Sequence, residues 1–470
     1  MKSYIKGIVT FSLGTWLKAI INFAQISMIT YLVSPEELGK AVMFSLLYNL
    51  GLVFSLFGLD EAFMRFYHEE ENKSRLFWSC LYPSLMIGIL LSSISIIFEK
   101  QMSRLLYGET YKWLGLLYAV TLISGVLQRY NQLYVRMKQD GVMFSILDVV
   151  NSGGNIIGML AYIFLVQRSF FSLFFGQLCG NLLALMVGFI VDSNSRRFQA
   201  IEWKRLTPYF KYAIPLVPSA LLFWLFSAID RITLRQLSDF SEIGLYSVAF
   251  KIASIINLFN SGFINFWKPT VFDKYKNDPN WRNFLRRVFL IASAIIFTLT
   301  VGLLTVKDVV FMLFQRNYRT ASFVLPALTL IPGMELLFNI TGVGIFFSKK
   351  TYWFFFIAAV GVTANYFGNI SLIPLLGARG AAISTGISYI LIFALRTAIS
   401  ERLCSINLPL KKFVTNLTIA MCVILFDTFI MNYLYDFLFS ASALFLLLIY
   451  NRAFLLNISK SIISLVNRNA

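Results

Sequence analysis

The sequence predicts an all-α protein that crosses a membrane many times. Of its 470 residues, 58% are hydrophobic and only 14% are charged, whereas a soluble domain carries roughly 25% charged residues. The apolar residues form continuous runs of about 20 residues, which is the length that a helix needs to cross the hydrocarbon core. Apolar and polar residues do not alternate within these runs, which excludes a transmembrane β-barrel.

Fourteen such runs follow one another along the chain, and each is interpreted as one transmembrane helix. Each run has about the length of one membrane crossing and is bounded by polar segments. We expect the helices over residues 11–33, 41–65, 76–98, 112–135, 142–166, 169–191, 212–237, 244–266, 288–306, 321–347, 352–374, 378–400, 412–434 and 437–456.

The net charge of +18 could indicate a nucleic-acid partner. However, most of the 41 Lys and Arg residues lie in the segments that are cytoplasmic when the N-terminus is placed inside. This is the positive-inside pattern, and it predicts that the N-terminus and the C-terminus are both cytoplasmic. The basic segments then set the orientation and contact anionic headgroups. We therefore expect membrane lipids, and no nucleic acid, as partners of these residues.

The cysteines and the single histidine do not indicate a catalytic or metal site. Cys80, Cys179, Cys404 and Cys422 show neither C-x-x-C spacing nor a cluster with histidine, so neither zinc binding nor a disulfide framework is supported. His68 lies in the polar segment "FYHEEENKSR", where a solvated residue is favoured over a proton carrier. We expect no catalytic residue, no metal and no organic cofactor, and hence no enzyme.

A repeat divides the chain into two similar parts. "SPEELG", after the first run, aligns with "DFSEIG", after the seventh, at a constant offset of 205 that places Glu37 on Glu242. Each copy contains six runs, and an even number keeps the two copies parallel. The sequence predicts two pseudo-symmetric six-helix lobes, residues 1–200 and 201–405, and then two additional transmembrane helices and a cytoplasmic tail over 406–470. The alternative is a chance similarity within apolar sequence.

Several motifs carry a resemblance to a known family. The "SPEELG" turn is followed by "GLDEAFMRFY" at the end of the second run, and "YAIPLVPSALLFWLFSAIDR" is followed by "SEIGLYSVAFKI". With fourteen runs in a six, six and two arrangement, nearly the whole chain resembles the bacterial polysaccharide-export flippases. These are O-antigen or capsule repeat-unit flippases of the multidrug/oligosaccharidyl-lipid/polysaccharide exporter superfamily.

The resemblance implies a location and an activity. It implies two lobes around a central cavity and alternating access. The substrate would be an undecaprenyl-diphosphate-linked oligosaccharide, moved between the leaflets of the bacterial cytoplasmic (inner) membrane. Polysaccharide polymerase and chain-length machinery would be further partners.

Basic residues inside the apolar runs are candidate substrate ligands. An ionised side chain at the bilayer centre costs at least about 2.5 kcal/mol, so it requires a wet cavity, a partner or an interface. Lys18, Arg65 and Arg129 lie in the first lobe and would give it a cationic inner wall. Lysine offers a diphosphate a point charge and arginine offers it a bidentate fork. We expect these residues to line the cavity.

Acidic residues of the same lobe leave a second interpretation open. Asp60, Glu61 and Asp148 also lie in or beside apolar sequence. They could neutralise the basic residues in static ion pairs without touching a substrate. The sequence therefore allows both roles for the basic residues, lining of the cavity and structural pairing.

The seventh run contains charges that cannot pair with each other. Asp230 and Arg231 are adjacent and point about 100° apart around a helix, whereas Arg231 and Arg235 share a face. We expect Asp230 to pair with Lys251 on the next helix and Arg231 to face the cavity or the opposite lobe, where these residues would form a gate contact. A static salt bridge between helices is the alternative.

Two acidic residues are candidates for energy coupling. Glu335 follows Pro332 and Gly333, which would loosen the tenth helix and expose backbone carbonyls. Asp427 lies in the thirteenth run, outside the two lobes. Either residue could bind the coupling ion, H⁺ or Na⁺, or could instead be a satisfied structural acid.

Three classes of function remain. The flippase interpretation leads because the intramembrane charges include several cations, which suit an anionic substrate. A multidrug or cation antiporter of the same superfamily would more naturally line its cavity with acids. A membrane-embedded polysaccharide polymerase or ligase typically carries a large outer loop, and no outer segment of this chain is long.

Overall fold

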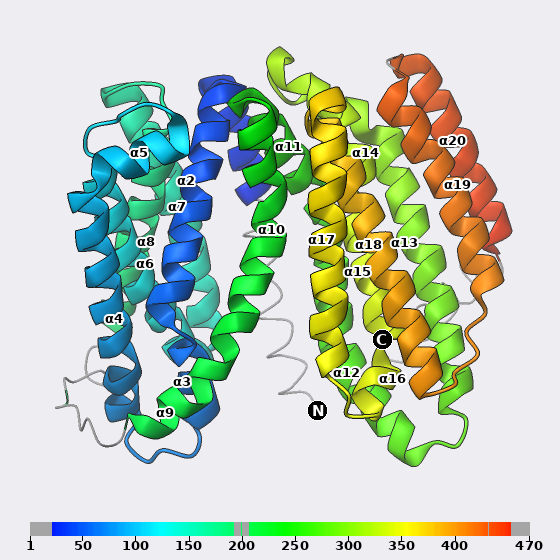
Figure 1. Ribbon diagram of the computed structural model, residues 1–470, viewed down its shortest axis with the longest axis horizontal. Coiled ribbons are helices and arrows are strands. Elements are labelled where there is room, and N and C mark those ends of the chain that lie inside the picture. The colour runs from blue at the N-terminus through cyan, green and yellow to red at the C-terminus, as the bar shows by residue number, and fades with distance from the viewer. Residues whose placement is uncertain (1–20, 192–198, 200–205, 431, 453–470) are drawn as a thin grey trace, which may run out of the picture. The chain divides into compact units, whose positions relative to one another are not determined.

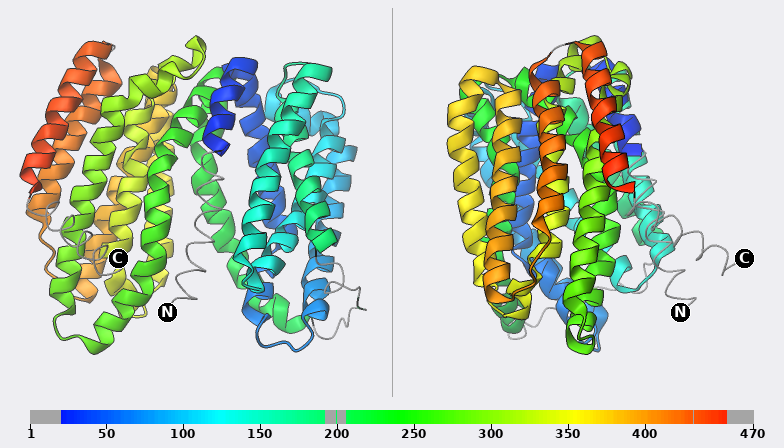
Figure 2. Two further views of the ribbon diagram at one scale, coloured as in Figure 1. Left: turned by 180° about the vertical axis from the view of Figure 1, so that it is seen from behind. Right: turned by 90° about the vertical axis from the view of Figure 1, so that its right-hand side faces the viewer.

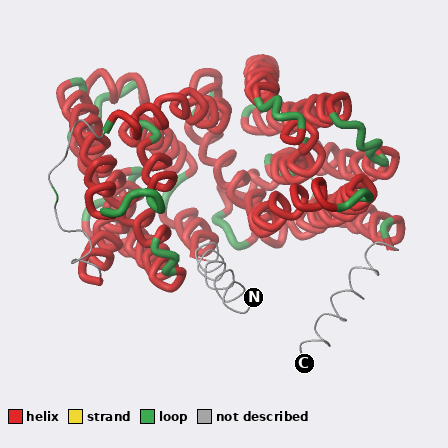
Figure 3. Tube along the Cα trace, turned by 90° about the horizontal axis from the view of Figure 1, so that it is seen from below, coloured by secondary structure: helices red, strands yellow, loops and turns green. Residues whose placement is uncertain are grey.

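The computed structural model describes residues 21–191, 199, 206–430 and 432–452, which form helices joined by turns and short loops (Figures 1 and 3). Eleven of the described helices are long and apolar enough to cross a membrane. The predicted all-α membrane fold is therefore confirmed. The chain divides into two compact units, Met1–Arg231 and Ile232–Ala470.

Unit 1 contains a helix over residues 21–32 and then the following elements. They are α2 (Pro35–Leu56), α3 (Leu59–Phe66), α4 (Lys73–Ile97), α5 (Glu99–Tyr107), α6 (Leu114–Met137), α7 (Gly141–Leu165), α8 (Phe171–Val191), α9 (Thr207–Ala213), the 3₁₀ helix η3 (Ile214–Leu216) and α10 (Val217–Leu237), whose last residues belong to unit 2.

Unit 2 continues with longer helices and with short ones. They are α11 (Phe240–Ala253), η4 (Ser254–Ile256), α12 (Asn257–Asn277), α13 (Trp281–Met312), η5 (Arg316–Phe323), α14 (Leu325–Leu328), α15 (Leu330–Thr341), α16 (Val343–Phe347), α17 (Tyr352–Leu376), α18 (Ala378–Leu403), α19 (Leu410–Phe429) and α20 (Tyr433–Tyr450). Within this unit, α19 and α20 both pack against α13 (Figure 2).

The second predicted transmembrane helix is two helices. Phe57 and Gly58 have φ angles of 48° and 74°, and this left-handed turn ends α2 and begins α3. A Cβ atom on Gly58 would lie 2.8 Å from the carbonyl oxygen of Ala213, so the close approach of α9 also requires glycine here. An apolar run gives no signal of such a turn, because hydropathy does not record backbone conformation.

The tenth predicted helix is a series of short helices, η5 and α14 to α16. Pro332 was expected to loosen this helix, but it lies within α15 and not at a break between helices. Pro332 lies in the first turn of α15, where a helix does not need the missing N–H. Its carbonyl oxygen accepts a hydrogen bond from Nδ2 of Asn260 on α12 at 2.8 Å. That carbonyl is therefore occupied by a neighbouring helix.

The core of unit 1 includes residues just before and at the start of the seventh predicted run, 212–237. Leu206, Tyr209 and Ala213 are buried in one cluster with Phe63 of α3 and Phe77 of α4. Burial of these side chains ties α9 to the helices of unit 1. The structural units consequently divide at Arg231, inside α10, and not at residue 200.

In unit 1, the "SPEELG" turn forms a double cap. The Ser34 hydroxyl oxygen accepts a hydrogen bond from the backbone N–H of Glu37 at 3.3 Å and caps α2. Oε2 of Glu37 accepts a hydrogen bond from the backbone N–H of Phe170 at 2.7 Å, immediately before α8. One acidic residue thus stabilises the start of a second, distant helix, since a helix N-terminus favours negative charge.

In unit 2, the aligned turn forms the same pair of contacts. Oδ1 of Asp239 accepts from the backbone N–H of Glu242 at 2.9 Å and caps α11. Oε2 of Glu242 accepts from the backbone N–H of Ala378 at 2.6 Å, at the start of α18. The residues that align in sequence therefore have the same local structure in both units.

Candidate functional site

An ion pair joins α3 to α6 in unit 1. Nε and Nη2 of Arg129 lie 3.1 and 2.8 Å from Oδ2 of Asp60. The side chain of Asp60 is 10% exposed and that of Arg129 is 36% exposed. Asp60 takes two of the five donors that a guanidinium offers. Arg129 is therefore paired with an acid of its own lobe, and its guanidinium still has donors for a further anion.

The other predicted charges of unit 1 lie in different surroundings. Arg65 is exposed and pairs with Glu69, one helical turn further on. Glu61 is exposed. Asp148 is buried and accepts a hydrogen bond from Nε2 of Gln132 at 2.7 Å. The structure thus brings Asp60 and Arg129 together, whereas Arg65 and Asp148 have partners that the sequence did not indicate.

The predicted gate residues are distributed over both units. Asp230 is buried, and Arg231 donates a hydrogen bond to the carbonyl oxygen of Ser227 on its own helix. Both belong to unit 1, whereas Lys251 is exposed and belongs to unit 2. The expected pair of Asp230 with Lys251 therefore stays a prediction. Lys18 lies outside the described residues.

A network of amide side chains links the helices of unit 1. Oδ1 of Asn181 accepts hydrogen bonds from Asn151 at 3.2 Å and from Gln177 at 3.0 Å, and its Nδ2 donates to Ser124 at 3.1 Å. Gln177 also accepts from Asn155 at 3.4 Å. Such polar contacts between α6, α7 and α8 stabilise helix packing in an apolar solvent. The sequence analysis did not identify this network.

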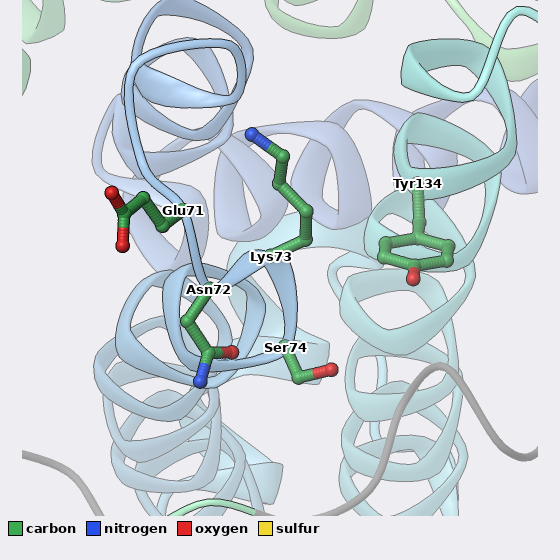
Figure 4. Close-up of a pocket in the computed structure, with 5 residues that line it drawn as sticks. All are labelled: Glu71, Asn72, Lys73, Ser74 and Tyr134. Atoms are coloured by element: carbon green, nitrogen blue, oxygen red, sulfur yellow. The ribbon is translucent and has the colours of Figure 1, made fainter.

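A shallow hollow lies where the α3–α4 turn approaches α6 (Figure 4). It has a volume of about 460 Å³ and is lined by Glu71, Asn72, Lys73, Ser74 and Tyr134. The ammonium of Lys73 donates to two carbonyl oxygens of the preceding turn. This cation therefore stabilises the turn that precedes α4.

In unit 2, Glu335 on α15 interacts electrostatically with Arg396 on α18. The Arg396 guanidinium lies over the rings of Phe338 and Phe354, with centroid distances of 4.6 and 4.4 Å. Within the described part of the chain, its Nε has no hydrogen-bond partner. The structure thus holds this cation between two aromatic rings near an acid.

The second coupling candidate, Asp427, belongs to a larger cluster. Nζ of Lys307 on α13 lies 3.8 Å from Asp427 on α19, 3.1 Å from Asp436 on α20 and 3.2 Å from its neighbour Asp308. The side chains of Lys307 and Asp427 have no exposed surface. Lys307 lies just outside the ninth predicted run, residues 288–306, and was not a predicted site residue. The sequence signal for a buried charge here is the Lys–Asp dipeptide within "LLTVKDVVFMLF".

The chain has relatives among known protein families and solved structures. The family model for "Polysaccharide biosynthesis protein" matches residues 28–322, which is more than half of the chain. No curated protein sequence matches.

Three solved structures share the fold. The lipid II flippase MurJ in an inward closed conformation matches with a TM-score of 0.71 and 16% identity, over 95% of this chain and 100% of that chain. An inward-facing multidrug resistance MATE family transporter of the MOP superfamily matches with a TM-score of 0.64 and 15% identity, over 85% and 98%.

An outward-facing transporter of that MATE family matches with a TM-score of 0.57 and 14% identity, over 86% of this chain and 96% of that chain. The predicted resemblance is thereby confirmed at the level of family and fold. This multi-pass membrane chain belongs to the polysaccharide biosynthesis protein family and has the fold of MurJ and the MATE transporters.

Proposed function

We propose that the protein is a flippase that moves a lipid-linked oligosaccharide across the bacterial cytoplasmic membrane. Membership of the polysaccharide biosynthesis family carries this proposal. The fold, which is shared with a lipid II flippase over nearly the whole of both chains, supports it. The proposed substrate is an oligosaccharide repeat unit of O-antigen or a related polysaccharide, linked to undecaprenyl diphosphate.

The charges of unit 1 support an anionic head group. Arg129 has three donors beyond the two that Asp60 accepts, and the ion pair holds the guanidinium in one orientation. Arg65 is exposed and its pairing with Glu69 is a surface contact, which an incoming anion can replace at little cost. A diphosphate would therefore meet one fixed and one adjustable cation, and Lys18 is the third proposed ligand.

Alternating access would move this head group between the two leaflets. In this proposal the basic loops keep both termini in the cytoplasm, and Arg231, Lys251 and Asp230 form a gate in the outer half. A coupling ion, H⁺ or Na⁺, would bind at Glu335 or Asp427. Polysaccharide polymerase and chain-length machinery would receive the product.

A multidrug or cation antiporter is the second candidate. Its support is the fold, which the chain shares with MATE transporters in two conformations. The sign of the substrate charge separates the candidates. The Arg129 donors and Arg65 favour an anion, whereas a cationic drug would be repelled by them.

The test is a flipping assay with the purified protein in vesicles. A lipid-diphosphate oligosaccharide is placed in both leaflets, and a membrane-impermeant lectin or oxidant measures how fast the inner pool becomes accessible. We expect faster exposure than in protein-free vesicles and no transport of cationic dyes. Dye transport without oligosaccharide flipping would establish the antiporter instead, and modification of the sugar chain itself would indicate an enzyme.

A further inference from the structure

The Lys307 cluster of unit 2 contains more negative than positive charge. Lys307, Asp427 and Asp436 have side chains that are at most 1% exposed, and Asp308 is 15% exposed. With every group ionised, the three fully buried residues alone carry a net charge of −1, and Asp308 makes the sum −2. An uncompensated buried charge is strongly unfavourable, and a carboxyl group in such a place takes up a proton instead.

Distances distinguish the three carboxyl groups. The ammonium of Lys307 is within hydrogen-bond distance of Asp436 and Asp308, at 3.1 and 3.2 Å. Asp427 lies further away, at 3.8 Å, and among the described residues neither of its oxygens has a hydrogen-bond partner. Lys307 therefore already has two carboxylate partners. Asp427 is the buried acid that receives least compensation.

The elements that pack against α19 are α13, α14, α20 and η5. α13 provides Lys307 and Asp308, and α20 provides Asp436; these are the charges that act on Asp427. α14 is apolar. On η5, Arg316 and Arg319 are exposed and Tyr318 is buried. Arg379 of α18 donates to the backbone carbonyl of Thr428 at 3.4 Å and not to a carboxylate of the cluster.

We propose that Asp427 holds a proton in the folded protein, so that Lys307, Asp308, Asp427 and Asp436 form a proton-binding site that joins α19 and α20 to α13. One proton on Asp427 makes the three buried groups neutral as a set. A metal cation is disfavoured because the Lys307 ammonium already occupies the position between the carboxylates. Asp427 is also one of the two residues proposed to bind a coupling ion, but a proton that neutralises this buried cluster requires only the fold of unit 2 and does not depend on transport.

The site makes the packing of α19 and α20 sensitive to pH. In the unfolded chain Asp427 is an ordinary exposed carboxyl group and is ionised at neutral pH. The folded protein then binds one proton more than the unfolded chain does, so its stability falls as the pH rises. At alkaline pH the bound proton leaves, and Asp427 and Asp436 repel each other across the contact between α19 and α20.

The test compares isosteric variants of the full-length protein in lipid nanodiscs. Asn has the shape of a neutral aspartic acid, so D427N should be at least as stable as the wild type and should lose the fall in melting temperature between about pH 6 and about pH 9. D436N should be less stable, because Lys307 loses its nearest hydrogen-bonded partner. The outcome that overturns the proposal is a D427N protein that fails to fold, melts as low as D436N, or keeps the wild-type dependence on pH.

A surface pair provides the matched control. The side chain of Asp278 is 30% exposed and accepts a hydrogen bond from Lys274 at 3.0 Å. That hydrogen bond lowers the pKa of Asp278, so this acid is ionised throughout the pH range of the test. D278N should therefore leave the wild-type dependence on pH unchanged. A D278N protein that lost this dependence would remove the assignment to the buried cluster.

Infrared spectroscopy detects the proton directly. At neutral pH, the wild-type spectrum minus the D427N spectrum should contain the carbonyl stretch of a protonated carboxyl group, and the wild-type spectrum minus the D278N spectrum should not. The absence of this band from the D427N difference spectrum would show that Asp427 does not hold the proton. Replacing K⁺ by Na⁺ in the buffer should shift neither the band nor the melting temperature. A shift that is specific to Na⁺ and that D427N abolishes would show a metal-cation site instead.

Discussion

The carboxylate of Glu242 accepts a hydrogen bond from the backbone N–H of Ala378 at 2.6 Å, across 136 positions of sequence. The aligned Glu37 binds the backbone N–H of Phe170 at 2.7 Å, across 133 positions. In each unit, an acid from the first turn of one helix stabilises the start of a distant helix, α18 in unit 2 and α8 in unit 1. This shared contact explains why the two acidic turns have similar sequences, since both must supply an N-cap and a carboxylate three residues later.

Removing either long-range cap should destabilise its unit. In E242A the Ala378 N–H loses a charge-assisted hydrogen bond, which typically contributes about 1.5 to 3 kcal/mol. We expect a lower melting temperature in detergent and reduced abundance in the membrane, and we expect the same for E37A. E36A is the control, because Glu36 is exposed and pairs only with Lys40. Equal melting temperatures for E242A and E36A would show that the cap is unimportant.

The residue before α18 should tolerate no side chain. Gly377 has a φ angle of 58°, and a Cβ atom there would lie 2.6 Å from Oε2 of Glu242. In G377A we expect a loss of about 1 to 3 kcal/mol of stability, because the backbone is strained and the cap is displaced. G302A is the control, since a Cβ at Gly302 has no neighbour within 4 Å. Equal melting temperatures for G377A and G302A would contradict this account.

The ion pair between Asp60 and Arg129 should be visible in a double-mutant cycle. D60N leaves the guanidinium without its partner, and R129Q leaves a nearly buried carboxylate, so R129Q should cost more. Because Arg129 is 36% exposed, solvent reduces the coupling to about 1 kcal/mol. Thermal denaturation of both single variants and the double variant measures this coupling. Additive effects would show that the two charges do not stabilise each other.

Basic residues of unit 1 should matter for transport more than for folding. R65A and K18A should reduce surface polysaccharide while the protein stays in the membrane, because each removes a positive charge proposed to meet the diphosphate. K18R should be milder, since it keeps the charge. R319A is the control, because Arg319 is exposed on η5 of unit 2. Full polymer levels in both alanine variants, at equal expression, would remove the anionic-substrate assignment.

Glu335 should distinguish coupling from structure. The E335Q side chain keeps its shape and its hydrogen-bonding capacity but does not titrate. If Glu335 carries the coupling proton, E335Q should fold and fail to flip substrate in vesicles with an imposed pH gradient. If it only balances the charge of Arg396, E335Q should instead lose membrane abundance, because a partly buried cation is left uncompensated. Gradient-driven flipping at the wild-type rate would exclude Glu335 from coupling.

The positions of the helices could be predicted from the sequence because membrane spans depend on local properties. A run of apolar residues must satisfy its backbone hydrogen bonds internally, so it forms a helix wherever it is long enough. The similarity of the two acidic turns could also be recognised in the sequence, since an N-cap residue followed by an acid three positions later is a local pattern. The turn at Phe57 and Gly58 and the short helices of the tenth run were missed because hydropathy does not record backbone angles.

The partner of each buried charge was decided by tertiary structure alone. Arg129 finds Asp60 across 69 positions, and Lys307 finds Asp436 across 129. A charge inside an apolar span needs a compensating group, and the span itself shows this. The compensating group, however, belongs to a neighbouring helix that is identified only by the tertiary packing. Lys307 lies just beyond the ninth predicted run, so its burial could not be predicted from the sequence, and only the packing of α19 and α20 on α13 places three carboxyl groups beside it.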